Sequence, residues 1–428
     1  MNQQLARSII GCLNVSGCSG SAGQELACFR PPEWLRILDW LDVSGLSLYF
    51  FDAMEKSDGG AKLPPFVKDR LNKNFLDNRQ RVTRIADEFF GLNNLFRRYD
   101  IRYAALKGFS KVPDYCHDAN LRTQFDHDFL VEPESSTTVD LALRSAGYIP
   151  KESHEAHPRA YILSGTPAWP REGRNNLYSS RLARAVEIHT QLWDSESEGV
   201  PFRLPKDFLQ RAVDRSWGGQ TYPALCEEDA LLFEVLHALR HLFRSWCRLS
   251  VLYEMACFLD TRRSDADFWR RFEERILGVP YLSQAAGVVF ALAERLLQCE
   301  IPISARSLAI NVLTPPQRLW VDRYGEALAI DNFRKTKFSH FLQREFAASS
   351  PFREAPSRRR LLPTWKRVRE VFASALQALL YSPHGLQQTF YTVGRVRHHI
   401  TASLGYALEH SRWRRLRAKS MTEKEGNA

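Results

Sequence analysis

The sequence predicts an α+β protein in which a small mixed sheet lies between N-terminal helices and a larger C-terminal helical region. Three observations lead to this prediction. Apolar residues recur at helical spacing from residue 66 to 99, short β-prone runs follow between residues 103 and 192, and helical spacing returns from Glu227 onward. A chain of 428 residues is also long enough for two or three domains.

Changes in composition divide the chain into five predicted parts. These are a flexible tail (1–28), an N-terminal helical segment (29–98), a sheet-containing core (99–195), a helical domain (196–350) and a basic helical tail (351–428). The first 24 residues hold one basic residue, Arg7, and one short apolar patch, which is too weak for a secretory leader. Pro64 and Pro65 precede the long helical stripe.

Four strands and one helix are predicted inside the core. Runs rich in β-branched and aromatic residues place the strands at 103–106, 125–131, 161–163 and 185–192. A helix runs from Pro133 to Ser145, because a proline and a group of Ser and Thr residues supply capping chemistry at its start. The long polar loop 165–180 is typical of a functional or a disordered segment.

The composition favours a reducing, cytoplasmic location. No apolar run approaches the ~18 residues that a membrane-spanning helix needs. None of the eight cysteines forms a CxxC pair, so their spacing indicates neither a disulfide framework nor a zinc site. The four cysteines at 226, 247, 257 and 299 lie in apolar helical contexts and are expected to be core thiols.

Positive charge is concentrated at the C-terminal end of the chain. Residues 353–428 hold 15 of the 59 Lys and Arg residues but only 5 of the 49 Asp and Glu residues, so the whole formal excess of +10 lies there. This asymmetry favours an anionic partner for the tail, including an anionic membrane surface that the protein could approach from the cytoplasm.

Two carboxylates stand two residues apart in the run from Phe125 to Val131. Because side chains alternate in a strand, Asp126 and Asp128 are expected to point the same way, about 6.5–7 Å apart. Their repulsion and lost solvation are relieved by a divalent cation such as Mg²⁺, which takes oxygen ligands. Taken alone, the pair is equally compatible with the exposed face of an edge strand.

Three further motifs accompany this acidic strand. They are Leu106-Lys107-Gly108 at the end of an apolar strand, Leu121-Arg122 after a polar spacer, and Val186-Glu187-Ile188-His189 in a later strand. Together with Asp126-x-Asp128-Phe-Leu-Val, they resemble the bacterial nucleotidyltransferase-like proteins of the polymerase-beta-like superfamily. The resemblance covers about residues 65 to 260, and the combination is far more specific than any one of its parts.

The resemblance implies a nucleotidyltransferase core with a three-carboxylate Mg²⁺ site. Asp126, Asp128 and Glu187 would bind the metal, and Glu187 could also act as the general base. His189 lies on the same strand face as Glu187 and would orient a ligand or the acid, or serve as a structural histidine.

The same resemblance places phosphate-binding residues upstream of the acids. Lys107 and Gly108 would lie along the triphosphate of an NTP donor, where glycine permits close backbone approach and lysine supplies a point charge. Arg122 would steady phosphate, with a surface salt bridge as its alternative role.

Two residues depart from the family pattern. His127 stands where an aliphatic residue is usual, and we expect it to face away from the carboxylates. Phe109 replaces the serine that many superfamily members carry after the glycine, which leaves phosphate contact to Lys107 and to backbone N–H groups.

The implied reaction is Mg²⁺-dependent transfer of a nucleoside monophosphate from an NTP to a hydroxyl-type acceptor, a small molecule or a protein. The two departures keep open a non-catalytic binding or scaffold protein with the same fold. The basic tail alone suggests a peripheral protein of envelope or polysaccharide assembly.

The C-terminal tail carries one further amphipathic pattern. Its apolar stripe on residues 365–379 is expected to pack on the protein itself, which would leave the terminal Arg412–Lys419 cluster free to recruit an anionic partner. In that cluster, Trp413 stands among arginines and could stack on nucleic acid bases.

Overall fold

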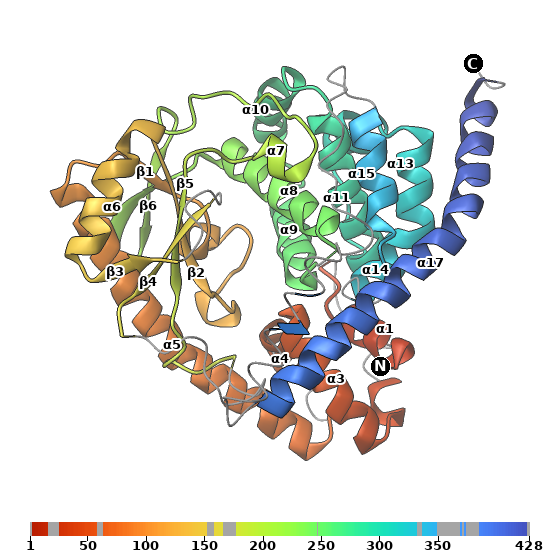
Figure 1. Cartoon of the computed structure of the whole chain (residues 1–428), viewed down its shortest axis with the longest axis horizontal. Coiled ribbons are helices and arrows are strands. Elements are labelled where there is room, and N and C mark those ends of the chain that lie inside the picture. Colours follow the sequence, from red (N-terminus) through yellow and green to blue (C-terminus); the bar gives the residue numbers. More distant parts are fainter. Residues whose placement is uncertain are drawn as a thin grey trace. The chain divides into compact units, whose positions relative to one another are not determined.

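The computed structural model describes residues 2–15, 25–57, 63–151, 158–165, 177–245, 247–331, 336–348, 369, 372–373 and 385–425. The chain forms two compact units (Figure 1). The first comprises Met1–Asp194, Phe202–Leu239 and Arg248–Val312, and the second comprises Ser195–Pro201, Arg240–Cys247 and Leu313–Ala428.

The described residues contain one mixed seven-stranded sheet flanked by helices, which confirms the predicted α+β class. The strands are β1 (Tyr103–Ala105), β2 (Asp126–Val131), β3 (Tyr148–Pro150), β4 (Arg159–Leu163), β5 (Ala185–His189), β6 (Val213–Trp217) and β7 (Gln220–Ala224), in the order β3-β4-β5-β2-β1-β7-β6. β2 pairs antiparallel with β1 and parallel with β5, so it is an interior strand and not an edge strand. The sheet also extends past the predicted core boundary at residue 195, because β1 pairs with β7.

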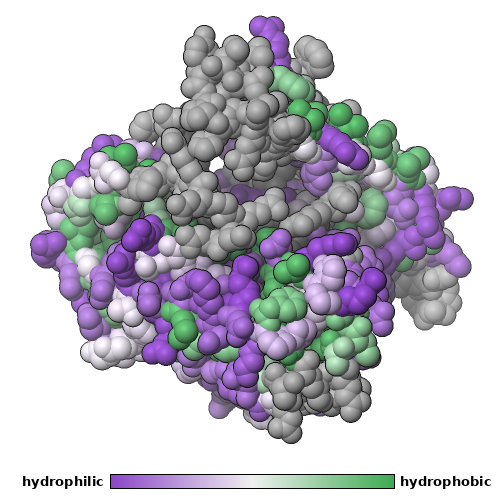
Figure 2. All heavy atoms as spheres, turned by 90° about the horizontal axis from the view of Figure 1, so that it is seen from below, coloured by the Kyte–Doolittle hydropathy of each residue, from purple (hydrophilic) through white to green (hydrophobic). Residues whose placement is uncertain are grey.

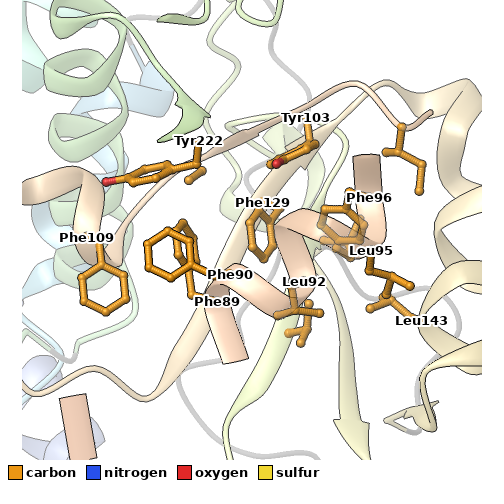
Figure 3. Packing of buried hydrophobic residues seen from close by; sticks show 14 of the residues in the cluster. Phe89, Phe90, Leu92, Leu95, Phe96, Tyr103, Phe109, Phe129, Leu143 and Tyr222 are labelled. Carbon is orange, nitrogen blue, oxygen red and sulfur yellow. The ribbon is translucent and has the colours of Figure 1, made fainter. Parts of the chain in front are cut away.

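Helix α5 (Pro65–Arg98) packs along one face of the sheet, and its apolar stripe forms the core there. Figure 3 shows Phe89 and Phe96 of α5 beside Phe129 of β2. The ring centroid of Phe129 lies 5.8 Å from that of Phe89 and 5.0 Å from that of Phe96. Aromatic pairs of this kind add about 0.5–1.5 kcal/mol each beyond their buried area. α6 (Ser136–Ser145) closes the same core with Leu143.

The N-terminus differs from the expected flexible tail. Residues Gln3–Cys12 form α1, capped by the side chain of Asn2, and the side chains of Leu5 and Ile9 are fully buried. Full burial of such a side chain contributes about 1.5–3 kcal/mol, enough to hold a short amphipathic helix on the body of the protein. The prediction of a flexible tail is therefore wrong for these residues.

Helices make up the rest of the described chain. α3 (Pro31–Ser44) ends at Gly45, whose φ of +74° suits glycine, and α4 (Ser47–Lys56) follows. After the sheet come α8 (Glu227–Phe243), α9 (Leu249–Thr261), α10 (Ala266–Leu277), α11 (Leu282–Leu297), α12 (Ile303–Ala305), α13 (Pro315–Trp320), α14 (Glu326–Ile330), α15 (Ser339–Ala348) and α17 (Gly385–Glu425), with α7 (Ser195–Glu198) before them. Two short π-helical turns, Arg306–Ile310 and Val321–Gly325, continue α12 and α13.

The C-terminal helix α17 contributes to the core of the second unit. Trp413 is 3 % exposed, and its ring stacks on Phe341 of α15 at 5.2 Å between centroids. Arg417 donates a hydrogen bond to Glu345. The idea that Trp413 stacks on nucleic acid is therefore wrong, because this ring is a core residue. Most of the predicted stripe 365–379 lies outside the described residues, and Phe372 within it is exposed.

Among the described residues, no helix is long and apolar enough to cross a membrane. On the face shown in Figure 2, hydrophilic side chains predominate and hydrophobic ones occur in small groups. The described cysteines are free thiols. Of the four predicted core thiols, Cys247 and Cys299 are buried, whereas Cys226 and Cys257 are only half-buried.

Candidate functional site

Strand β2 separates the hydrophobic core from a group of acids because its side chains alternate. His127 and Phe129 face α5, and the imidazole of His127 stacks near Phe89 at 6.2 Å. Its Nε2 lies 3.3 Å from Glu88 of the same helix. Asp126 and Asp128 consequently lie on the opposite face. The expectation that His127 points away from the carboxylates is confirmed.

The parallel partner β5 brings a third acid to that face. The register places Glu187 beside Asp128 and His189 beside Leu130, while Val186 enters the core cluster. Carboxylate and imidazole atoms of Asp128, Glu187 and His189 all lie within 4.8 Å of one another. His189 Nε2 is 3.1 Å from Asp128 Oδ1 and 3.9 Å from Glu187 Oε2.

Lys107 and Gly108 arrive at the same place from the end of β1. The Nζ atom of Lys107 donates a hydrogen bond of 2.8 Å to Asp128 Oδ1, and its side chain is 11 % exposed. Gly108 has a φ of +70°, and a Cβ there would lie 2.8 Å from the Gln124 amide nitrogen. Glycine is therefore required for the chain to turn beside Gln124, whose amide donates to the backbone carbonyl of Asp126.

The three carboxylates share too little positive charge for all of them to be ionised, as the directions of their pKa shifts indicate. Burial would raise the pKa of Asp128, but Lys107 and His189 hold it well below its usual range. Burial and the neighbouring Asp128 raise the pKa of Asp126. Burial, followed by Asp128 and Asp126, raises the pKa of Glu187 to about 8. Lys107 is therefore not sufficient to keep all three acids ionised at neutral pH. We call Lys107, Asp126, Asp128 and Glu187 the acid site.

The donor set of the acid site fits a divalent cation. The side chain of Asp128 is fully buried, and its Oδ2 atom has no hydrogen-bond partner among the described residues. Because an ionised carboxylate only accepts, the Nε2 of His189 must donate to it, so His189 orients Asp128 in this arrangement. Two carboxylates with a free buried oxygen suit a hard cation. The predicted ligand Asp126 is not part of the cluster that Asp128, Glu187 and His189 form, and its observed effect on that cluster is electrostatic, because its charge raises the pKa of Glu187.

Arg122 lies in a second ionic group, adjacent in sequence to the acid site. Its Nε donates to Glu254 Oε1 at 3.1 Å, and Lys111 Nζ lies 2.7 Å from both Glu254 Oε2 and Glu234 Oε2. Tyr49 also donates to Glu254. Two cations thus face two anions, and we call Lys111, Arg122, Glu234 and Glu254 the balanced cluster.

The balanced cluster shows what sequence reasoning missed. Lys111 and Glu234 lie 123 residues apart, and no motif in the sequence connects them. Lys111 ends the short helical turn Gly108–Lys111, whose four residues are all buried, and nothing in the sequence of this turn indicates that burial.

Comparison with known proteins gives one match. A protein-family model described as uncharacterised nucleotidyltransferase matches residues 30–298, which is more than half of the chain and includes every strand of the sheet. No curated protein and no solved structure matches the chain.

Proposed function

The chain belongs to the uncharacterised nucleotidyltransferase family, and from this premise we propose that it transfers a nucleoside monophosphate from an NTP to a hydroxyl-type acceptor. The observation that supports this proposal best is the acid site, where Asp128 presents a buried oxygen without a hydrogen-bond partner among the described residues. A triphosphate carries charge of the same sign as these acids, so the two can meet only if a cation lies between them.

We propose Mg²⁺ as that cation, with Asp128, Glu187 and Asp126 as the residues that would hold it. A bound divalent ion would neutralise the triphosphate and lower the pKa of an attacking hydroxyl. The chain prepares the ligands itself. His189 fixes the orientation of Asp128. Without a cation, burial, Asp128 and Asp126 raise the pKa of Glu187 to about 8. A bound cation would favour the ionised form of Glu187, which could then accept a proton from an acceptor hydroxyl.

Lys107, Gly108 and Arg122 are the proposed phosphate-binding residues. Lys107 donates a hydrogen bond to Asp128 in this structure. A cation bound to Asp128 would replace Lys107 as the partner of that carboxylate, and the ammonium group of Lys107 could then bind phosphate. Glu254 holds Arg122 through Nε, whereas Nη1 is buried and has no hydrogen-bond partner among the described residues. This leaves donor capacity on the guanidinium that a phosphate oxygen would fill.

The departure at position 109 does not weaken this proposal. Phe109 is 2 % exposed and its ring lies 4.1 Å from that of Trp217 in the aromatic core. The side chain at position 109 therefore points into the core and not toward the proposed phosphate site. A serine at this position would not contact the phosphate. Gly108 is itself buried and lines a small cavity together with Arg122 and Gln124.

Transfer is tested with the full chain, each of the four NTPs labelled at the α-phosphate, and Mg²⁺ with or without added hydroxyl acceptors. We expect Mg²⁺-dependent pyrophosphate release and a labelled product with at least one NTP, and Asp128→Asn should give neither. NTP binding without turnover for any acceptor would instead support the second candidate, a non-catalytic nucleotide-binding scaffold. Absence of both NTP binding and Mg²⁺ binding would contradict both candidates.

A further inference from the structure

Helix α17 is apolar on two opposite sides (blue in Figure 1). Its inner side packs on the second unit through Ala402, Tyr406 and Trp413, which are 1 %, 3 % and 3 % exposed. A helix that only completes the core of its own unit needs one apolar side. The second apolar side therefore calls for its own explanation.

The outer side carries a row of exposed aliphatic residues. Val393, Ile400, Leu404 and Leu408 are 47 %, 46 %, 60 % and 81 % exposed. Intervals of seven, four and four residues place them on one face of the helix. Single exposed aliphatic residues are ordinary, but an aligned row marks an interaction surface. We call these four residues the outer stripe.

Arginines continue the outer stripe and flank it. Arg397 lies on the line between Val393 and Ile400, and Arg415 continues the line seven residues after Leu408, and both are exposed. Arg412 and Arg414 are exposed beside it.

The acid in this stretch of α17 faces the other way. Glu409 accepts hydrogen bonds from Arg323 and Tyr324 of the second unit, so its charge belongs to the inner side. The outer side is thus apolar and basic.

We propose that the outer stripe and its arginines bind an anionic lipid surface, with α17 lying in the plane of the interface. Aliphatic side chains would enter the region of the headgroups, and Arg397, Arg412 and Arg415 would contact anionic phosphates. The helix is not apolar enough to cross a membrane, which fits a helix that lies on the surface.

Two other occupants fit the same surface less well. Antiparallel pairing of two copies about Leu404 would bring Arg397 of one helix opposite residue 411 of the other, next to Arg412, and like charges in contact destabilise such a pair. Nucleic acid would use the arginines but not the aliphatic row, and Trp413, the aromatic residue of this cluster, is buried.

Vesicle flotation of the full-length protein tests the proposal. Vesicles of phosphatidylcholine alone are compared with vesicles in which about one third of the lipid is phosphatidylglycerol, at low and high salt. The variants are Leu404→Gln with Leu408→Gln, and Arg412→Gln with Arg415→Gln. Leu35→Gln is the matched control, because Leu35 is 59 % exposed on α3.

We expect binding to the anionic vesicles only, with loss at high salt. The leucine double variant should need at least about tenfold more lipid for half-binding, the arginine double variant should lose the dependence on anionic lipid, and Leu35→Gln should bind as the unchanged protein does. The proposal is overturned if the unchanged protein ignores anionic vesicles or if the leucine variant binds them equally well. It is also overturned if the protein is a dimer that the leucine variant converts to a monomer.

Discussion

The first unit contains two buried ionic groups that differ in charge balance. In the balanced cluster, Lys111 and Arg122 face Glu234 and Glu254, and burial, which would raise the pKa of Glu254, is outweighed by Arg122 and Lys111, so this pKa lies below its usual range. In the acid site, Lys107 faces three carboxylates, and the pKa of Glu187 rises to about 8.

From this difference we infer that the balanced cluster stabilises the fold and that the acid site binds a ligand. A buried ion pair with matched partners is complete as it stands. A buried group of acids with a deficit of positive charge is stable only if protons or a cation supply the difference. The comparison therefore predicts that changes in the acid site alter activity and pH response, whereas changes of the two acids of the balanced cluster, Glu234 and Glu254, alter stability.

The largest expected effect is on activity. Asp128→Asn should reduce nucleotidyl transfer by about a thousandfold or more, equivalent to roughly 4 kcal/mol of activation free energy, because it removes the buried negative charge that would bind the cation and that pairs with Lys107. Initial rates with saturating NTP and Mg²⁺ are the measurement. Glu234→Gln is the control from the balanced cluster and should keep most of the activity of its folded fraction. Equal losses in the two variants would remove the functional distinction between the groups.

The next effect is on stability. Glu254→Gln should lower the free energy of unfolding by about 3–5 kcal/mol, because Lys111 and Arg122 would stay buried with half of their negative charge removed. Urea denaturation monitored by Trp fluorescence measures this loss. Asp126→Asn provides the contrast from the acid site. Since its pKa is raised, the metal-free variant should be as stable as the original or slightly more stable. A large loss for Asp126→Asn would contradict the comparison.

A pH dependence sharpens the comparison further. The pKa of Glu187 rises from 4.5 to about 8 on folding. A group whose pKa is raised in the folded state stabilises the protein at pH values below its pKa in the unfolded state. This contribution is lost as the pH rises through its pKa in the folded state. In EDTA, the Tm of the protein should therefore fall between about pH 5 and pH 8 relative to that of Glu187→Gln, and Mg²⁺ should restore it at pH 8. Parallel pH profiles for the two proteins would show that Glu187 does not carry this charge deficit.

The smallest expected effect concerns Lys107. Lys107→Ala should weaken NTP binding about 10- to 100-fold in the presence of Mg²⁺ while leaving the free nucleoside nearly unaffected, since the proposed partner is phosphate. Isothermal titration with both ligands measures the two affinities. If both affinities fall together, Lys107 serves only to hold Asp128.

Local pattern was sufficient to predict which side chains share a face within each strand, whereas the meeting of the two strands was implied only by the family resemblance. The alternation in β2 fixed which side of the strand Asp126 and Asp128 share, and the acid-apolar-His spacing did the same for Glu187 and His189. Both strands keep apolar residues at the intervening positions, apart from His127, which has its own acidic partner at Glu88. These relations depend only on neighbours in sequence.

Long-range pairing could not be predicted in the same way. Which carboxylate meets Lys111 depends on how α8 and α9 pack against the turn after β1, and no spacing encodes that. β6 and β7 join the sheet only because Ala224 pairs with Ala105, far away in sequence. Likewise, α1 is too short to be stable as an isolated helix, and the burial of Leu5 and Ile9 depends on surfaces formed by distant segments.

The parallel register between β2 and β5 determines both the packing of the core and the position of the acids. Asp128 pairs with Glu187, while Val186 and Ile188 supply the core on the reverse side of the same strand. Insertion or deletion of one residue within β5 would turn Glu187 and His189 into the aromatic core and expose the two aliphatic residues. Such a variant would fail to fold before it could lose its ligands. We therefore expect members of this family to keep the lengths of these two strands. They should differ by substitutions within the strands and by the lengths of the loops between them.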